Sequence, residues 1–129
     1  MKLDRDMVRD LLFALEAKTD FKARKYEELL PDGDPREVAY ALMKMHEAGF
    51  ITAEVIRSTT TPERIIKVLP FDLTFNGHEF LDTVRDDEVW RRTKSAAEKA
   101  GGASITFVWE LAKAYGKQLL NERLGIPIP

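Results

Sequence analysis

The chain has 129 residues, of which 44% are hydrophobic and none is cysteine, so it can bury one core but cannot form a disulfide framework, a thiolate zinc site or a cysteine nucleophile. Its formal net charge of −2 offers no general attraction for nucleic acid, and any DNA-binding surface must depend on local charge. No apolar run is long enough to cross a membrane, and Met1 leads directly into a charged amphipathic segment. We therefore expect a soluble, cytoplasmic protein without a signal peptide.

The first predicted element is a helix over about residues 4–18. Asp4 is its expected N-cap, and Val8, Leu11, Leu12 and Leu15 follow the i, i+3, i+4, i+7 spacing of one helix face. The next segment, residues 19–33, is compatible with either a short helix or a strand, and it ends in a predicted turn at Pro-Asp-Gly.

The second predicted helix, residues 35–48, has the clearest start and stop signals in the chain. Asp34 is placed to cap it, Pro35 occupies its first position, and Glu37 can reach back to the cap backbone. Gly49 is expected in the left-handed conformation that ends a helix, with Phe50 packing back on the last turn.

From residue 51 to residue 69 the apolar period changes to two, which predicts a β-hairpin with a polar loop over residues 58–63. Thr74 is a plausible cap for a further helix that buries Phe80, Leu81 and Val84. Two more helices are expected, one after the acidic residues 86–88 and ending at Gly101-Gly102, and one capped by Ser104. The last helix has a wide apolar face, which we assign to the core ahead of a dimer interface.

This order predicts an α+β fold. We expect a winged-helix-like domain, with helices and a two-stranded β-hairpin wing, over about residues 1–85. Residues 86–129 would form two additional C-terminal helices that either pack on this domain or make a homodimer.

Several phrases together resemble the domain-of-unknown-function family numbered 2513, a group of uncharacterised bacterial and prophage proteins. They are MKLDRD at 1–6, EVAY at 37–40, EAGFI at 47–51, LTFNGHEFLD at 73–82, RDD at 85–87 and VW at 89–90. The resemblance covers nearly the whole chain and implies a phage- or prophage-associated protein with a winged-helix-like N-terminal part, but no activity. Ala41 departs from the family pattern, in which histidine often follows the tyrosine of the second helix.

The first candidate site is a contact with double-stranded DNA. In a winged helix one helix enters the major groove and the wing reaches phosphate. The alternative is a solvated hairpin with ordinary surface charges, and the sequence does not decide between the two. The residues that would contact DNA are Arg36, Tyr40 and Lys44 on the helix, with His46 as a further candidate, and Arg57, Thr59, Thr60, Arg64 and Lys67 in the wing, where Ser58 and Thr61 add hydroxyl groups.

Catalytic chemistry finds little support in the sequence. His78 and Asp82 share a helix face, but a catalytic zinc needs three protein ligands and the other histidine, His46, lies on a different element. No serine lies in a glycine-flanked turn and no glycine loop resembles a phosphate-binding motif. We therefore expect neither an enzyme nor a metal or other cofactor.

The second candidate site is a protein-docking surface in the C-terminal part. Asp86 and Asp87 precede several basic residues, which indicates either ordinary helix ion pairs, the favoured interpretation, or an acidic docking patch. Trp90 and Trp109 are expected in the core, and either would be a docking candidate if exposed. The functional expectation is a DNA-binding transcriptional regulator; the alternative is a non-enzymatic protein-interaction module that modulates a host factor.

Overall fold

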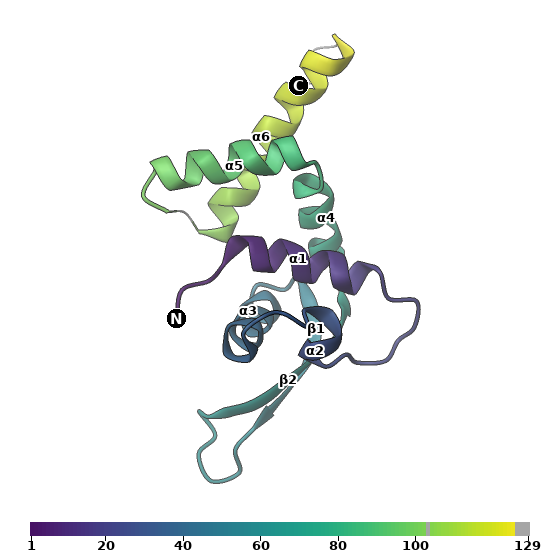
Figure 1. Ribbon diagram of the computed structural model, residues 1–129, viewed down its shortest axis with the longest axis vertical. Helices are drawn as coiled ribbons and strands as arrows, with labels where there is room; N and C mark the ends of the chain where they lie inside the picture. The colour runs from purple at the N-terminus through teal and green to yellow at the C-terminus, as the bar shows by residue number, and fades with distance from the viewer. Residues whose placement is uncertain (103, 126–129) are drawn as a thin grey trace. The chain divides into compact units, whose positions relative to one another are not determined.

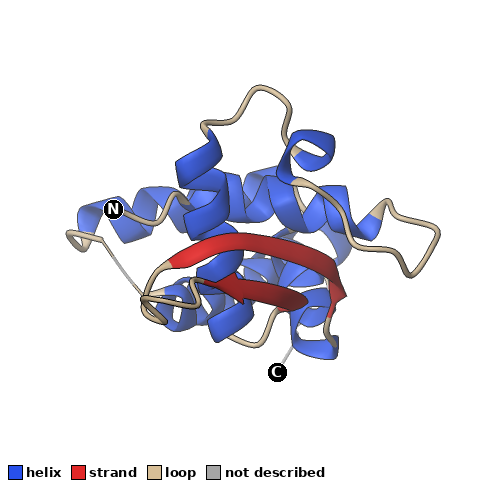
Figure 2. Cartoon of the chain, turned by 90° about the horizontal axis from the view of Figure 1, so that it is seen from below, coloured by secondary structure: helices blue, strands red, loops and turns tan. Residues whose placement is uncertain are grey.

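The computed structural model describes residues 1–102 and 104–125, and within these it has an α+β fold of six helices and one two-stranded antiparallel sheet (Figures 1 and 2). None of the described helices is both long and apolar enough to cross a membrane. The elements in chain order are α1 (Arg5–Glu16), α2 (Tyr26–Leu29), α3 (Pro35–Glu47), β1 (Ile51–Arg57), β2 (Ile65–Leu73), α4 (Phe75–Val84), α5 (Asp87–Lys99) and α6 (Ile105–Leu124).

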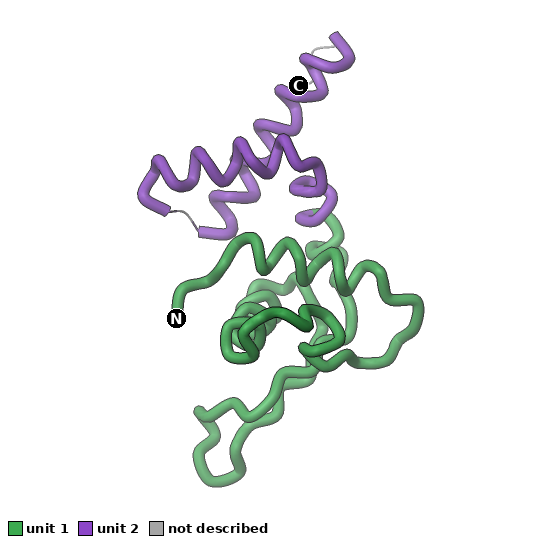
Figure 3. Tube along the Cα trace, in the orientation of Figure 1, with its two compact units in different colours: residues 1–79 green, residues 80–129 purple. Residues whose placement is uncertain are grey.

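The chain divides into two compact units, residues 1–79 and 80–129 (Figure 3). Unit 1 contains α1 to β2 and the first turn of α4, so the division falls ahead of the boundary expected at residue 85. Unit 2 contains the rest of α4, α5 and α6.

The predicted N-caps of α1 and α3 are confirmed. The carboxylate of Asp4 accepts a hydrogen bond from Met7 N, and that of Asp34 accepts from Arg36 N and Glu37 N. The predicted apolar faces of both helices are buried and form the core of unit 1 together with Leu29, Phe50, Ile51, Val68 and Leu73. The ambiguous segment after α1 contains a short helix, α2, and no strand among its described residues.

The end of α3 has the expected left-handed glycine. Gly49 has φ of 78°, and its N–H bonds to the His46 carbonyl at 3.0 Å while Phe50 N–H bonds to the Met45 carbonyl at 2.9 Å. This pair of hydrogen bonds closes the last turn and directs the chain into β1. Phe50 O then accepts from Thr74 N at 2.9 Å, and the Thr74 hydroxyl donates to the Gly49 carbonyl. The start of α4 is therefore bonded directly to the end of α3.

The predicted hairpin is confirmed, but its second strand continues to Leu73, beyond the expected end at residue 69. β1 and β2 pair antiparallel with register shifts after Thr52 and after Ile56. Pro70 lies opposite Ala53, beside the first of these shifts, where its missing N–H does not interrupt the ladder. On the other edge of β2 the Pro70 carbonyl accepts a hydrogen bond from Arg24 N at 2.9 Å.

Unit 2 is built on the pairing of α5 with α6. Asp86 caps α5 through the N–H groups of Glu88 and Val89. Ser104 caps α6 through Phe107 N, as predicted. The wide face expected for α6 is only partly buried, because Phe107 is 47% exposed and does not join Val108 in the core. The remaining core residues of this unit are Phe80, Leu81, Val84, Val89, Trp90, Ala97, Ala112 and Leu119.

Candidate nucleic-acid interface

The loop of the wing is held by its own polar groups. Ser58 N–H donates to the Arg64 carbonyl at 2.9 Å, and the Ser58 side-chain oxygen accepts from the N–H groups of Thr60 and Thr61. It also lies 3.1 Å from the Thr60 hydroxyl. The hydroxyl groups of Ser58 and Thr60 therefore bond within the loop. Thr59 is exposed at its tip.

The basic side chains of the wing have no carboxylate partner among the described residues. Arg57 makes one hydrogen bond to the Pro62 carbonyl at 3.4 Å, and Arg64 and Lys67 are exposed. None of the three forms an ion pair with any residue in the ranges 1–102 and 104–125. Within residues 57–67 these three cations are opposed by Glu63, and three minus one leaves a local charge of +2 on a chain whose net charge is −2.

The exposed side of α3 is less uniform. Arg36 is exposed at the first turn and has no ion-pair partner among the described residues. Lys44 is engaged by its neighbours, because its ammonium lies 3.0 Å from the Glu47 carboxylate and 5.4 Å from the centroid of the Tyr40 ring. The hydrogen bond to Glu47 raises the pKa of Lys44, which stays charged but is partly neutralised. Arg36 is therefore the better phosphate ligand of the two. His46 is half-buried, with Nδ1 3.3 Å from the Ile51 carbonyl.

A groove brings the helix and the wing together. It has a volume of about 530 Å³ and lies along α2, α3 and β2. Arg36 and Tyr40 from α3 and Lys67 from β2 all line it, so three of the candidate DNA contacts share one surface. Lys44, Arg57 and Arg64 do not line it. The rest of the lining is largely apolar and includes Ala39, Leu42, Met43, Ile65, Ile66 and Val68.

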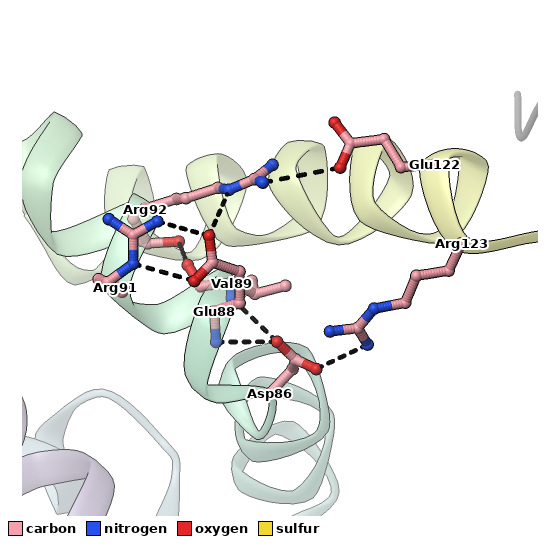
Figure 4. Close-up of polar contacts among 8 residues, drawn as sticks. Asp86, Glu88, Val89, Arg91, Arg92, Glu122 and Arg123 are labelled. Carbon is pink, nitrogen blue, oxygen red and sulfur yellow. Dashed lines mark hydrogen bonds and ion pairs between the residues drawn. The ribbon is translucent and has the colours of Figure 1, made fainter.

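The acidic cluster of unit 2 is occupied by contacts within that unit. One carboxylate oxygen of Asp86 accepts the two cap hydrogen bonds of α5 and the other accepts from Arg123 at 2.9 Å (Figure 4). Glu88 binds Arg91 and Arg92, and Arg92 also lies 3.6 Å from the Glu122 carboxylate. These contacts tie the start of α5 to the last turns of α6. Asp87 is exposed.

The electrostatic effects follow from these partners. Hydrogen bonds from the Arg91 and Arg92 guanidinium groups lower the pKa of the Glu88 carboxyl to about 2. The backbone N–H of Val89 and then the Arg123 guanidinium lower the pKa of Asp86. Both carboxylates are therefore charged at neutral pH and already matched by cations of this chain.

The two tryptophans are not free docking anchors. Trp90 is 4% exposed, as predicted for a core residue. Trp109 is half-buried, its ring meets Phe80 edge-on at 5.6 Å between centroids, and its Nε1–H donates to the Thr83 hydroxyl at 3.3 Å. Both indole rings therefore pack within unit 2.

Sequence reasoning did not identify the apolar part of the groove. Within this apolar part, Ile66 has 62% of its surface accessible although it lies in a run of β-branched residues. Such a run is typical of a strand covered on both faces, and that is the signal from which an uncovered face could have been suspected. Met43 carries no comparable signal.

Comparison with known proteins places the chain in a family without an assigned activity. Residues 2–103 match the family described as "Hypothetical protein (DUF2513)", and the chain belongs to that family. It is also similar to an uncharacterized protein of Haemophilus influenzae, with 30% identity over 125 residues that cover 93% of this chain and 99% of the relative. No solved structure matches the chain.

Proposed function

We propose that this member of the family is a winged-helix DNA-binding protein, a non-enzymatic transcriptional regulator of phage or prophage origin. The observation that carries the proposal is the set of four basic side chains on α3 and the wing, Arg36, Arg57, Arg64 and Lys67, which have no carboxylate partner among the described residues. DNA phosphates are the partners that such cations suit, since their neutralisation releases condensed counterions.

The arrangement of unit 1 supports this proposal. Three helices followed by an antiparallel hairpin is the order of a winged helix, with α3 in the position of the helix that enters the major groove. The hydrogen bond from Arg24 N to Pro70 O joins the segment between α1 and α2 to the outer edge of β2. The hairpin is thereby held at its base, while its tip carries exposed hydroxyl and guanidinium groups.

The size of the expected effect follows from the number of contacts. Each phosphate contact adds about −0.9 to the slope of log K against log salt, so four contacts give a slope of about −3.6. Affinity would then fall by roughly 150-fold between 50 and 200 mM salt. Such binding is weak for one subunit, and recognition of a specific site would use two subunits on adjacent half-sites.

The test is fluorescence anisotropy with a labelled mixed-sequence duplex across a salt series. We expect the variant Arg57→Ala/Arg64→Ala/Lys67→Ala to bind more weakly and to lower the magnitude of the slope by about 2.7, because three phosphate contacts are removed. The matched control is Lys22→Ala/Lys99→Ala/Lys117→Ala, which removes the same charge from exposed positions outside α3 and the wing. It should keep nearly the full slope. Absence of binding at low salt, or equal slopes for both triple variants, would contradict the proposal.

A further inference from the structure

The groove along α3 and β2 has an apolar interior that DNA phosphates would not fill. Leu42 and Val68, both buried, form part of its lining, and Ala39 and Met43 continue it along α3. Ile66 stands at the same groove with 62% of its surface exposed. A largely apolar groove with a volume of about 530 Å³ is in the size range of sites that bind side chains or small ligands.

The edge of β2 that borders this groove is only partly paired. The Pro70 carbonyl accepts a hydrogen bond from Arg24 N. The segment that contains Arg24 then continues into α2 and leaves this edge of β2. Residues 65–68 of β2 make no backbone hydrogen bond to any described segment other than β1 and the hairpin loop. Backbone groups alternate along a strand, so Val68, two residues before Pro70, directs its N–H and C=O groups toward this edge. An unpaired strand edge beside an apolar groove is the geometry used for strand addition.

The charges at the groove favour an acidic occupant. Arg36 and Lys67 line it from opposite walls, on α3 and β2, and neither has an ion-pair partner in the described part of the chain. Glu27 on α2 is the one carboxylate in the lining, so the groove keeps an excess of positive charge. A ligand that brings both apolar side chains and carboxylates matches this combination.

We propose that this groove binds an extended peptide segment of another protein, which adds as a strand to the free edge of β2 and carries apolar and acidic side chains together on the strand face turned toward α3. Its apolar side chains enter the space between α3 and β2, and its carboxylates meet Arg36 and Lys67. This site does not depend on DNA binding. Since Arg36 and Lys67 would serve both ligands, peptide and DNA would exclude each other.

The proposal is tested without DNA, using anisotropy of the fluorescent peptide acetyl-Asp-Thr-Ile-Thr-Val-Thr-Asp-amide, whose apolar and acidic side chains share one strand face. We expect saturable binding. An analogue with the same side chains but N-methylated at alternate residues should bind at least about tenfold more weakly, because two main-chain hydrogen bonds are lost. The analogue with lysine in place of each aspartate should also bind more weakly. Failure of the parent peptide to bind, or equal binding of the N-methylated analogue, would overturn the proposal.

Variants of the protein locate the site. Ala39→Phe fills the groove and should abolish binding, while Ala114→Phe, at an exposed position on α6, serves as the control and should bind as the wild type does. Lys67→Ala is an exposed change that leaves the core intact, and it should weaken binding about two- to fivefold. Unchanged binding by both Ala39→Phe and Lys67→Ala would place the peptide elsewhere.

Amide hydrogen exchange provides a direct reading of the strand edge. On addition of the peptide, exchange in residues 65–68 should slow, because the outward N–H groups acquire partners. Sedimentation equilibrium of the protein alone shows whether it forms a dimer, which is the alternative occupant of the edge. A dimer in which residues 65–68 are already protected without peptide would mean that a second copy of the chain occupies the edge, and the proposal of a separate peptide partner would be wrong.

Discussion

Replacement of Gly77 by alanine tests the contact that bonds α4 to the end of α3. Gly77 lies in the first turn of α4 and is buried. A Cβ atom at this position would overlap the carbonyl oxygen of Phe50 and lie 3.0 Å from its carbonyl carbon. The obstacle is backbone, so no side-chain rotation can relieve it.

The expected cost follows from what must move. The Phe50 carbonyl accepts from Thr74 N at 2.9 Å, and Phe50 N–H is bonded to Met45 O at 2.9 Å, so displacement of this peptide weakens both ends of the connection. Overpacking costs about 1–3 kcal/mol and a lost hydrogen bond about 1 kcal/mol, while alanine recovers about 1 kcal/mol of helix propensity. The net destabilisation should be about 1–3 kcal/mol.

Urea denaturation followed by far-UV circular dichroism measures this effect. With a slope of about 1–3 kcal/mol per molar urea, the midpoint of Gly77→Ala should fall by roughly 1 M. The matched control is Gly116→Ala within α6, where an added Cβ meets nothing within 4 Å. That variant should be as stable as the wild type or more stable by up to about 1 kcal/mol. If Gly77→Ala behaves like Gly116→Ala, the close approach of α4 to Phe50 is refuted.

Three further predictions concern single polar groups. Thr74→Val should destabilise the protein by about 1–3 kcal/mol, because it removes the hydroxyl that donates to the Gly49 carbonyl and accepts from Gly77 N. Thr74→Ser should retain most of the stability, and the midpoints of urea denaturation distinguish the two variants. Asp34→Ala should cost about 1 kcal/mol through loss of the α3 cap, and Asp34→Ser should restore it, again by urea midpoint. Glu88→Gln should lower the thermal midpoint at neutral pH. Folding lowers the pKa of Glu88 from its ordinary value of 4.5 to about 2, so this stabilisation is fully present above pH 4.5 and is lost as the pH falls toward 2. Calorimetry should therefore show the thermal midpoints of the wild type and the variant converging at low pH. A constant difference down to pH 2 would contradict the assigned pKa.

The helix ends of this protein could be read from the sequence because the interactions that make them are local. Asp34 caps groups two and three residues away, and Gly49 closes a turn with its immediate neighbours. The hairpin was predictable for the same reason, since its period and its loop lie within one short stretch. The end of β2 was predicted too early because the apolar run stops at Leu69, whereas the strand continues past Pro70, where the register shift accommodates the missing N–H.

Of the candidate site, the sequence by itself determined which residues are basic and on which elements they lie. The pairs of Lys44 with Glu47 and of Arg24 with Asp20 join residues three and four apart in the chain, so they too are local. The tertiary structure decided that Arg36 and Lys67 keep no ion-pair partner among the described residues. It also decided that α3 and β2 leave an apolar groove between them. The groove depends on contacts between residues far apart in the chain, and no local pattern records which side chains those contacts leave uncovered.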